Sequence, residues 1–110
     1  MPILVVLPAD RFVDEGRLRD VTGARDVRLA TEQELVELYP GIEVGAMPPL
    51  GPLFAQRVYI DQALAGQHEI VFHAGTHTDA IRMEYDEFVS LVQPIPGALS
   101  RGEEKWEYGA

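Results

Sequence analysis

The chain has 110 residues, of which 46% are hydrophobic and 25% charged, and this balance is typical of one globular domain rather than a disordered or fibrous protein. It contains no cysteine, which excludes disulfides, zinc–thiolate centres and thiol nucleophiles. The formal net charge is −9, and this excess of acid argues against general duplex binding, which depends on neutralising many phosphates. Contact with one nucleic-acid end stays possible, because it needs only a few local positive charges.

Positive charge is unevenly distributed along the chain. The single lysine is Lys105, and no lysine or arginine lies between Arg28 and Arg57. The apolar run near the start, residues 3–7, is too short for a signal-peptide core or a membrane span. We therefore expect a cytoplasmic protein.

The first half of the chain predicts two strands and two short helices. Residues 3–7 are continuously β-branched or leucine, which is typical of a buried central strand. Asp14 is a suitable N-cap for a helix that carries Leu18 and Val21 inward and ends at Gly23. Residues 26–29 are read as a second short strand.

The next element is predicted by a capping box. Thr31 and Glu34 have the spacing in which each side chain bonds the other residue's backbone N–H. The helix that follows places Leu35, Leu38 and Tyr39 on one face.

The second half predicts three strands and a closing helix. Strands are expected over residues 57–60, 70–72 and 80–83, the last with Ile81 and Met83 on one face and Arg82 on the other. Phe88, Leu91 and Val92 form an i, i+3, i+4 apolar set on the closing helix. These elements predict an α/β fold: one small domain whose mixed, curved sheet is flanked by short helices. The folded domain is expected to occupy residues 1–93, and residues 94–110 are expected to be a loosely held tail.

Two glycine-containing loops are the strongest candidates for a functional site. The first, residues 45–51, reads Gly-Ala-Met-Pro-Pro-Leu-Gly, and the second, residues 75–78, reads Gly-Thr-His-Thr. Paired prolines exclude helix and remove two donors, while glycines allow positive φ and close approach of the backbone. Such loops can direct backbone N–H groups at a carbonyl or an anion. The alternative is that both are ordinary turns.

Other kinds of site are disfavoured by their context. His73 and His77 are four residues apart, but a glycine bend separates them, so the spacing does not favour a metal site. Ser90 and Ser100 lack the context of a hydrolase nucleophile. The glycines form neither a dinucleotide fingerprint nor a phosphate loop.

Four ordered motifs carry a family resemblance. They are residues 7–11 (LPADR), 29–32 (LATE), 45–51 (GAMPPLG) and 75–83 (GTHTDAIRM). Together they resemble the YbaK/prolyl-tRNA synthetase-associated domain family of aminoacyl-tRNA deacylases, which edit mischarged tRNA either free-standing or inserted in prolyl-tRNA synthetase. The resemblance runs from about residue 5 to residue 92.

The resemblance implies a specific site. The two loops would line a pocket for the aminoacyl group at the 3′ end of tRNA, with the amides of Gly45 and Gly51 holding the ester carbonyl and His77 bounding the amino-acid pocket. The substrate-binding positions it implies are Met47, Pro48, Pro49, Gly75 and Thr76. The reaction would be ester hydrolysis by water, assisted by the terminal hydroxyl of the tRNA, with no cofactor, metal or covalent intermediate. Proline tRNA carrying alanine or cysteine is the expected substrate.

The chain also departs from the family pattern. Family members begin with an N-terminal segment that carries a functional lysine, and this sequence resembles roughly the last two thirds of the domain. The open edge expected beside residues 3–7 predicts a homodimer that covers it. The alternative function is a binding or interaction module that keeps the fold without the chemistry.

Overall fold

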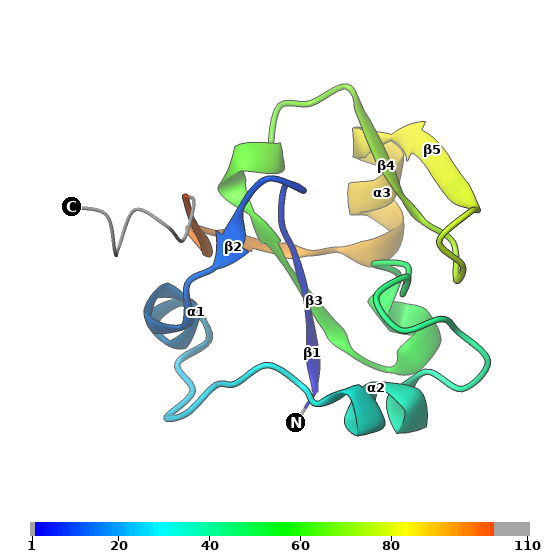
Figure 1. Ribbon diagram of the computed structural model, residues 1–110. Helices are drawn as coiled ribbons and strands as arrows, with labels where there is room; N and C mark the ends of the chain where they lie inside the picture. The colour runs from blue at the N-terminus through cyan, green and yellow to red at the C-terminus, as the bar shows by residue number, and fades with distance from the viewer. Residues whose placement is uncertain (1, 103–110) are drawn as a thin grey trace.

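The structure, a computed structural model, describes residues 2–102 and has a small parallel sheet at its centre (Figure 1). This sheet has the order β1-β3-β6, and both neighbouring pairs are parallel. Its strands are β1 (Ile3–Val6), β3 (Arg57–Asp61) and β6 (Ile95–Gly97). Parallel strands need crossovers, and the long connections between them carry all the other elements except the last strand, which follows β6.

Two antiparallel pairs and three α-helices surround the central sheet (Figure 1). The pairs are β2 (Phe12–Val13) with β7 (Ser100–Arg101), and β4 (Glu69–His73) with β5 (Ala80–Glu84). The helices are α1 (Glu15–Thr22), α2 (Glu32–Leu38) and α3 (Tyr85–Val92), and two short 3₁₀ turns are η1 (Gly51–Phe54) and η2 (Gln62–Leu64). The predicted α/β class in a single small domain is confirmed, with the mixed pairing divided among three sheets.

The central sheet is covered on both faces because alternate residues of β3 enter two different clusters. Val58 and Ile60 pack in a cluster with Phe88 of α3. Tyr59, between them, packs in a second cluster with Leu18 of α1. Alternation along a strand explains this division, since successive side chains point to opposite faces.

Strand β1 has the same two-faced character but lies at an edge of the sheet. Leu4 packs against the first cluster and Val5 against the second, which explains the continuous apolar run. The prediction of a central strand is nevertheless wrong: β3 lies between β1 and β6, so β3 is central. The apolar composition of a strand indicates whether both of its faces are buried, but not whether it has a hydrogen-bonded neighbour on one side or on both.

Both capping predictions are confirmed. Asp14 Oδ1 accepts the backbone N–H of Arg17 at 3.0 Å, and Gly23 ends α1 with φ +73°. At α2, Thr31 Oγ1 accepts the N–H of Glu34 at 3.2 Å, and Glu34 Oε1 accepts the N–H of Thr31 at 2.9 Å.

Three local predictions are wrong. Residues 26–29 form no strand, whereas β2, too short to show a period, was not predicted. Val21, predicted to face inward, is 36% exposed. Leu91 is 67% exposed, because α3 turns only Phe88 and Val92 fully inward.

The predicted loose tail is also wrong as far as residue 102. Residues 95–101 contain β6 and β7, and Leu99 is completely buried. Prolines and glycines suggested a loop, yet β6 forms its parallel ladder with β3 through Pro96 and Gly97 as well as Ile95. The rest of the predicted tail lies outside the described residues. Within residues 2–102, no helix is both long and apolar enough to cross a membrane.

Candidate functional site

The first glycine-containing loop begins with a tight turn over residues 43–46. The N–H of Ala46 donates to the carbonyl of Glu43 at 3.0 Å, and Gly45, the third residue of the turn, has φ +87°. Positive φ at that position is the requirement of a type II turn, which glycine meets without strain.

The second loop connects β4 to β5 and is closed by its own polar groups. Ala74 N–H donates to the carbonyl of Asp79 at 3.0 Å, while Thr76 Oγ1 donates to Asp79 Oδ2 at 2.6 Å. The hydroxyl of Thr76 also accepts the N–H of Asp79 at 3.0 Å. Thr76 therefore acts within the loop and shapes it, and Gly75, with φ +100°, supplies the bend.

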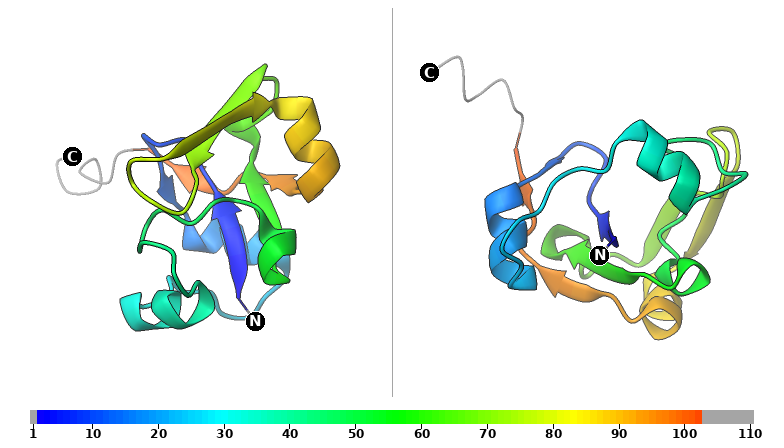
Figure 2. Two further views of the ribbon diagram at one scale, coloured as in Figure 1. Left: turned by 90° about the vertical axis from the view of Figure 1, so that its right-hand side faces the viewer. Right: turned by 90° about the horizontal axis from the view of Figure 1, so that it is seen from below.

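Hydrogen bonds join the two loops directly, and Figure 2 shows the loop after α2 lying beside the end of the β4–β5 hairpin. Glu43 N–H donates to the carbonyl of Gly75 at 2.9 Å, and Gly75 N–H donates to the carbonyl of Ala46 at 3.0 Å. The Glu43 carboxylate accepts the N–H of His77 at 2.6 Å. Glu43 and His77, 34 positions apart in the sequence, are thus fixed against each other.

The ring of His77 is held by the first loop. Its Nε2 lies 2.9 Å from the carbonyl oxygen of Val44. A carbonyl can only accept, so Nε2 carries a proton and donates it to this hydrogen bond. The ring also lies close to Gly45, where a β-carbon would come 3.4 Å from His77 Cε1.

The amide of Gly45 has a partner within its own loop. Its N–H donates to the thioether sulfur of Met47 at 3.3 Å. Sulfur is a weak acceptor, so an ester carbonyl would be a stronger partner for the same N–H. Met47 therefore occupies the position at which the resemblance expects the substrate carbonyl.

The remaining residues of the first loop are structural in this arrangement. Pro48 and Pro49 are buried. A β-carbon on Gly51 would lie 2.3 Å from the carbonyl oxygen of Gln56 and 2.4 Å from Val58 Cγ2, so close packing explains why this residue is glycine. A role for Gly51 in holding a carbonyl remains a prediction.

The residue that follows α2 packs against residues that come just after the first loop. Tyr39 is buried, its ring makes an edge contact with Phe54 at a centroid distance of 4.8 Å, and its hydroxyl donates to Gln56 Oε1. Burial raises the pKa of Tyr39 and the hydrogen bond to Gln56 opposes this, with a net rise, so the hydroxyl stays a donor.

His73 and His77 meet at ring centroids 5.4 Å apart and nearly perpendicular. Across residues 2–102 the structure contains no group of three or more histidine, aspartate or glutamate side chains placed to hold a metal ion. The two rings form an edge contact beside the two loops.

Sequence reasoning missed Glu43, which lies in the stretch without lysine or arginine between Arg28 and Arg57. It precedes the glycine of the turn by two residues, but no spacing rule connects a carboxylate in one loop with a backbone N–H in another. Only the tertiary arrangement identifies it.

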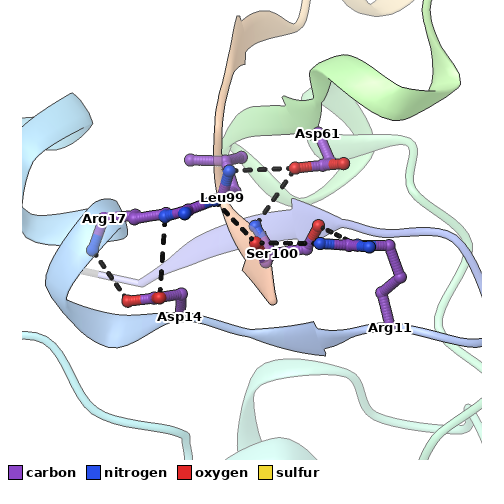
Figure 3. A network of polar contacts seen from close by, with 6 residues as sticks. All are labelled: Arg11, Asp14, Arg17, Asp61, Leu99 and Ser100. Atoms are coloured by element: carbon purple, nitrogen blue, oxygen red, sulfur yellow. Dashed lines mark hydrogen bonds and ion pairs between the residues drawn. The ribbon is translucent and has the colours of Figure 1, made fainter. Parts of the chain in front are cut away.

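A second polar network joins Asp61, at the end of β3, to the segment that enters β7 (Figure 3). Asp61 is 3% exposed, and its Oδ1 accepts the N–H groups of Leu99 at 2.9 Å and Ser100 at 3.1 Å. Arg11 Nε donates to Ser100 Oγ at 2.6 Å, and Arg17 Nη1 donates to the carbonyl of Ser100 at 3.1 Å. Ser100 is thereby fully engaged as a structural residue.

The pKa of Asp61 reflects this network. Burial raises the pKa, but hydrogen bonds from the backbone of Leu99, Ala63 and Ser100 outweigh it, and the net pKa is lowered. Asp61 is therefore a buried carboxylate that stabilises the fold through its charged form.

Comparisons with known proteins match this architecture. The family model of the aminoacyl-tRNA editing domain matches residues 1–91. A proline–tRNA ligase of Lactobacillus gasseri is 33% identical over 72 residues, which are 66% of this chain and 13% of the ligase. The chain therefore spans about an eighth of that relative's length.

Two solved structures share the fold. One, described as a proposed trans-editing enzyme for prolyl tRNA synthetase, has a TM-score of 0.76 at 28% identity, covering 91% of this chain and 62% of that one. Another, from a study of epitope backbone grafting onto scaffold proteins, has a TM-score of 0.79 at 23% identity over 91% of this chain and 65% of that one. The second likeness concerns the fold alone.

The resemblance expected from the four sequence motifs is thus confirmed by a match that includes both site loops. Because the family model covers residues 1–91 of the 110, this chain belongs to the aminoacyl-tRNA editing domain family.

Proposed function

We propose that this chain is an aminoacyl-tRNA deacylase, which hydrolyses the ester of mischarged tRNA in the cytoplasm. The supporting observation is that the ring of His77 faces Gly45 across two loops that hydrogen bonds hold together. The family to which the chain belongs supplies the substrate class. Proline tRNA carrying alanine or cysteine is the substrate we propose, on the strength of the proline–tRNA ligase relative and the trans-editing neighbour.

The chemistry proposed for this site relies on positioning. The Gly45 N–H would hold the ester carbonyl after Met47 moves aside, and the ring of His77 would bound the aminoacyl side chain. Water attacks the carbonyl carbon, a tetrahedral oxyanion forms, and its collapse breaks the ester bond and releases the amino acid and the tRNA hydroxyl. A backbone N–H directed at the developing oxyanion lowers the barrier without any nucleophile from the protein.

A direct assay tests this function. Loss of labelled alanine or cysteine from misacylated proline tRNA is followed with and without the chain, and His77→Ala is compared with His68→Ala, a histidine just before β4 at the far end of the hairpin. We expect hydrolysis that His77→Ala alters and His68→Ala leaves unchanged. No acceleration over buffer for either tRNA would reject the proposal.

A second candidate is a binding module without chemistry. It is favoured by the hydrogen bond from Gly45 N–H to Met47, which occupies the expected carbonyl position, and by a sequence whose single lysine is Lys105. Such a module would bind the aminoacylated 3′ end and slow its spontaneous hydrolysis, so the same assay separates the two candidates by the sign of the effect.

We also propose a homodimer that covers the free edge of β1. Among the described strands, β1 is paired only with β3, and its residues are half-buried and apolar. Such an edge can pair with another chain. Light scattering over a concentration series tests this, and a monomer at high concentration would reject it.

A further inference from the structure

We propose that Glu43 is a positioning residue, which fixes His77 at the site through a carboxylate–backbone hydrogen bond. This inference rests on the proposed function for its consequence in catalysis. The positioning of His77 by Glu43 is argued from the hydrogen bonds between the two loops alone.

Glu43 bridges the two loops with both its backbone and its side chain. Its N–H donates to the carbonyl of Gly75 at 2.9 Å, and its Oε1 accepts the N–H of His77 at 2.6 Å. These contacts bracket Thr76, so the backbone on each side of that residue is tied to one glutamate. The Glu43 oxygen acts here as an acceptor for the His77 N–H, and a neutral amide oxygen can fill the same role.

The residue after Glu43 completes the arrangement. The carbonyl of Val44 accepts from Nε2 of His77 at 2.9 Å, so adjacent residues hold the main chain and the ring of the same histidine. With its main chain and its Nε2 both held, the ring of His77 keeps one direction relative to Gly45. Loss of the carboxylate would release the backbone of His77, and the position of its ring relative to Gly45 would then vary.

The carboxylate has no competing assignment in the described part of the chain. No ion pair to Glu43 occurs among residues 2–102, and the sequence has no lysine or arginine from residue 29 to residue 56. Glu43 is exposed, and its side chain turns back to a backbone N–H of the neighbouring loop. This hydrogen bond is the contact that the structure gives to the carboxylate.

Three substitutions separate the hydrogen bond from the charge. Glu43→Ala removes both, Glu43→Gln keeps an acceptor oxygen without charge, and Glu43→Asp keeps the charge on a shorter arm. Glu37→Ala, an exposed acid of α2, is the matched control for the loss of one negative charge.

The first readout is independent of activity. Hydrogen exchange of the His77 amide, followed by NMR on the full chain, should become about tenfold faster in Glu43→Ala and Glu43→Asp. Glu43→Gln and Glu37→Ala should stay within about twofold of the unsubstituted chain. Unchanged exchange in both Glu43→Ala and Glu43→Asp would overturn the proposal, and so would equal acceleration in Glu43→Gln.

The second readout is deacylation of misacylated proline tRNA. We expect kcat/KM to fall about tenfold in Glu43→Ala and to be restored by Glu43→Gln, which a purely electrostatic role would not allow. If the unsubstituted chain shows no deacylation, the proposed function fails, while the exchange measurement still decides the role of Glu43. If deacylation is present and Glu43→Ala retains it in full, the positioning role in catalysis is rejected.

Discussion

A β-carbon added to Gly45 would lie 3.4 Å from Cε1 of His77, in van der Waals contact, so the glycine of one loop faces the histidine of the other. The contact joins parts of the chain that are 32 residues apart. It gives the most direct test of whether the two loops work as one site.

Gly45→Ala should lose activity through this contact. The substitution places a methyl group against the ring of His77 and also strains a residue at φ +87°, so we expect a loss of about 1 kcal/mol in stability and at least a tenfold fall in deacylation. Gly66→Ala is the matched control, because Gly66 has φ +86° and nothing within 4 Å of its added β-carbon. Equal activity of the two variants would show that Gly45 has no special role at the site.

Gly51→Ala should destabilise the folded protein. Its β-carbon would overlap the carbonyl oxygen of Gln56 at 2.3 Å, a backbone atom that cannot move freely, and we expect a loss of about 3 kcal/mol in the free energy of unfolding. Gly16→Ala, inside α1 with no contact closer than 3.4 Å, should instead stabilise by about 0.5 kcal/mol. Urea denaturation of both variants measures the contrast, and a Gly51→Ala chain of normal stability would contradict the packing argument.

Leu99→Ala tests whether the C-terminal strands belong to the core. Leu99 is completely buried beside Leu18 and Tyr59, and its truncation should cost about 3 kcal/mol. Leu91→Ala provides the comparison, since Leu91 is 67% exposed and should change stability by less than about 0.5 kcal/mol. Thermal unfolding of the two variants decides between the structure and the sequence-based expectation that residue 91 faces inward.

Asp61→Asn should reveal an acid-sensitive contribution to stability. The folded pKa of Asp61 is lowered, so its stabilising effect is present above the unfolded value of about 3.9 and is lost as the pH falls through the folded pKa. The asparagine side chain would keep one acceptor oxygen but turn its NH₂ toward a backbone N–H. We therefore expect the free energy of unfolding to fall by about 2 kcal/mol at pH 7. Urea denaturation measures the free energy of unfolding of the unsubstituted chain and of Asp61→Asn. The difference between these two values should become smaller below about pH 4, and a difference that does not change with pH would refute this prediction.

Glu34 should titrate well below an ordinary glutamate. Its carboxylate is held by the side chain of Arg28, with Nη1 to Oε1 at 2.7 Å and Nη2 to Oε2 at 2.8 Å, and by the N–H of Thr31, which lowers the pKa of Glu34 to about 2. NMR titration of the side-chain carboxyl measures this value. In Arg28→Gln the midpoint should rise toward the ordinary range near 4.3, and an unchanged midpoint would contradict the assignment.

The sequence determined the features that depend on neighbours along the chain. Asp14 and Thr31 cap their helices as their spacing required, and the apolar alternation of residues 80–83 produced a strand. The glycines at residues 45 and 75 adopt the positive φ that their turns need. These outcomes follow from short-range sterics and hydrogen bonds, which a local pattern encodes.

The tertiary structure decided everything that depends on distant partners. Pairing on both sides made β3 the central strand, and the ladder with β3 converted the expected loose segment after residue 93 into β6. The same is true of Glu43, whose carboxylate meets the N–H of His77 only because the hairpin folds over the turn. Composition and spacing carry no information about which backbone groups meet across the fold, so that knowledge came from the structure alone.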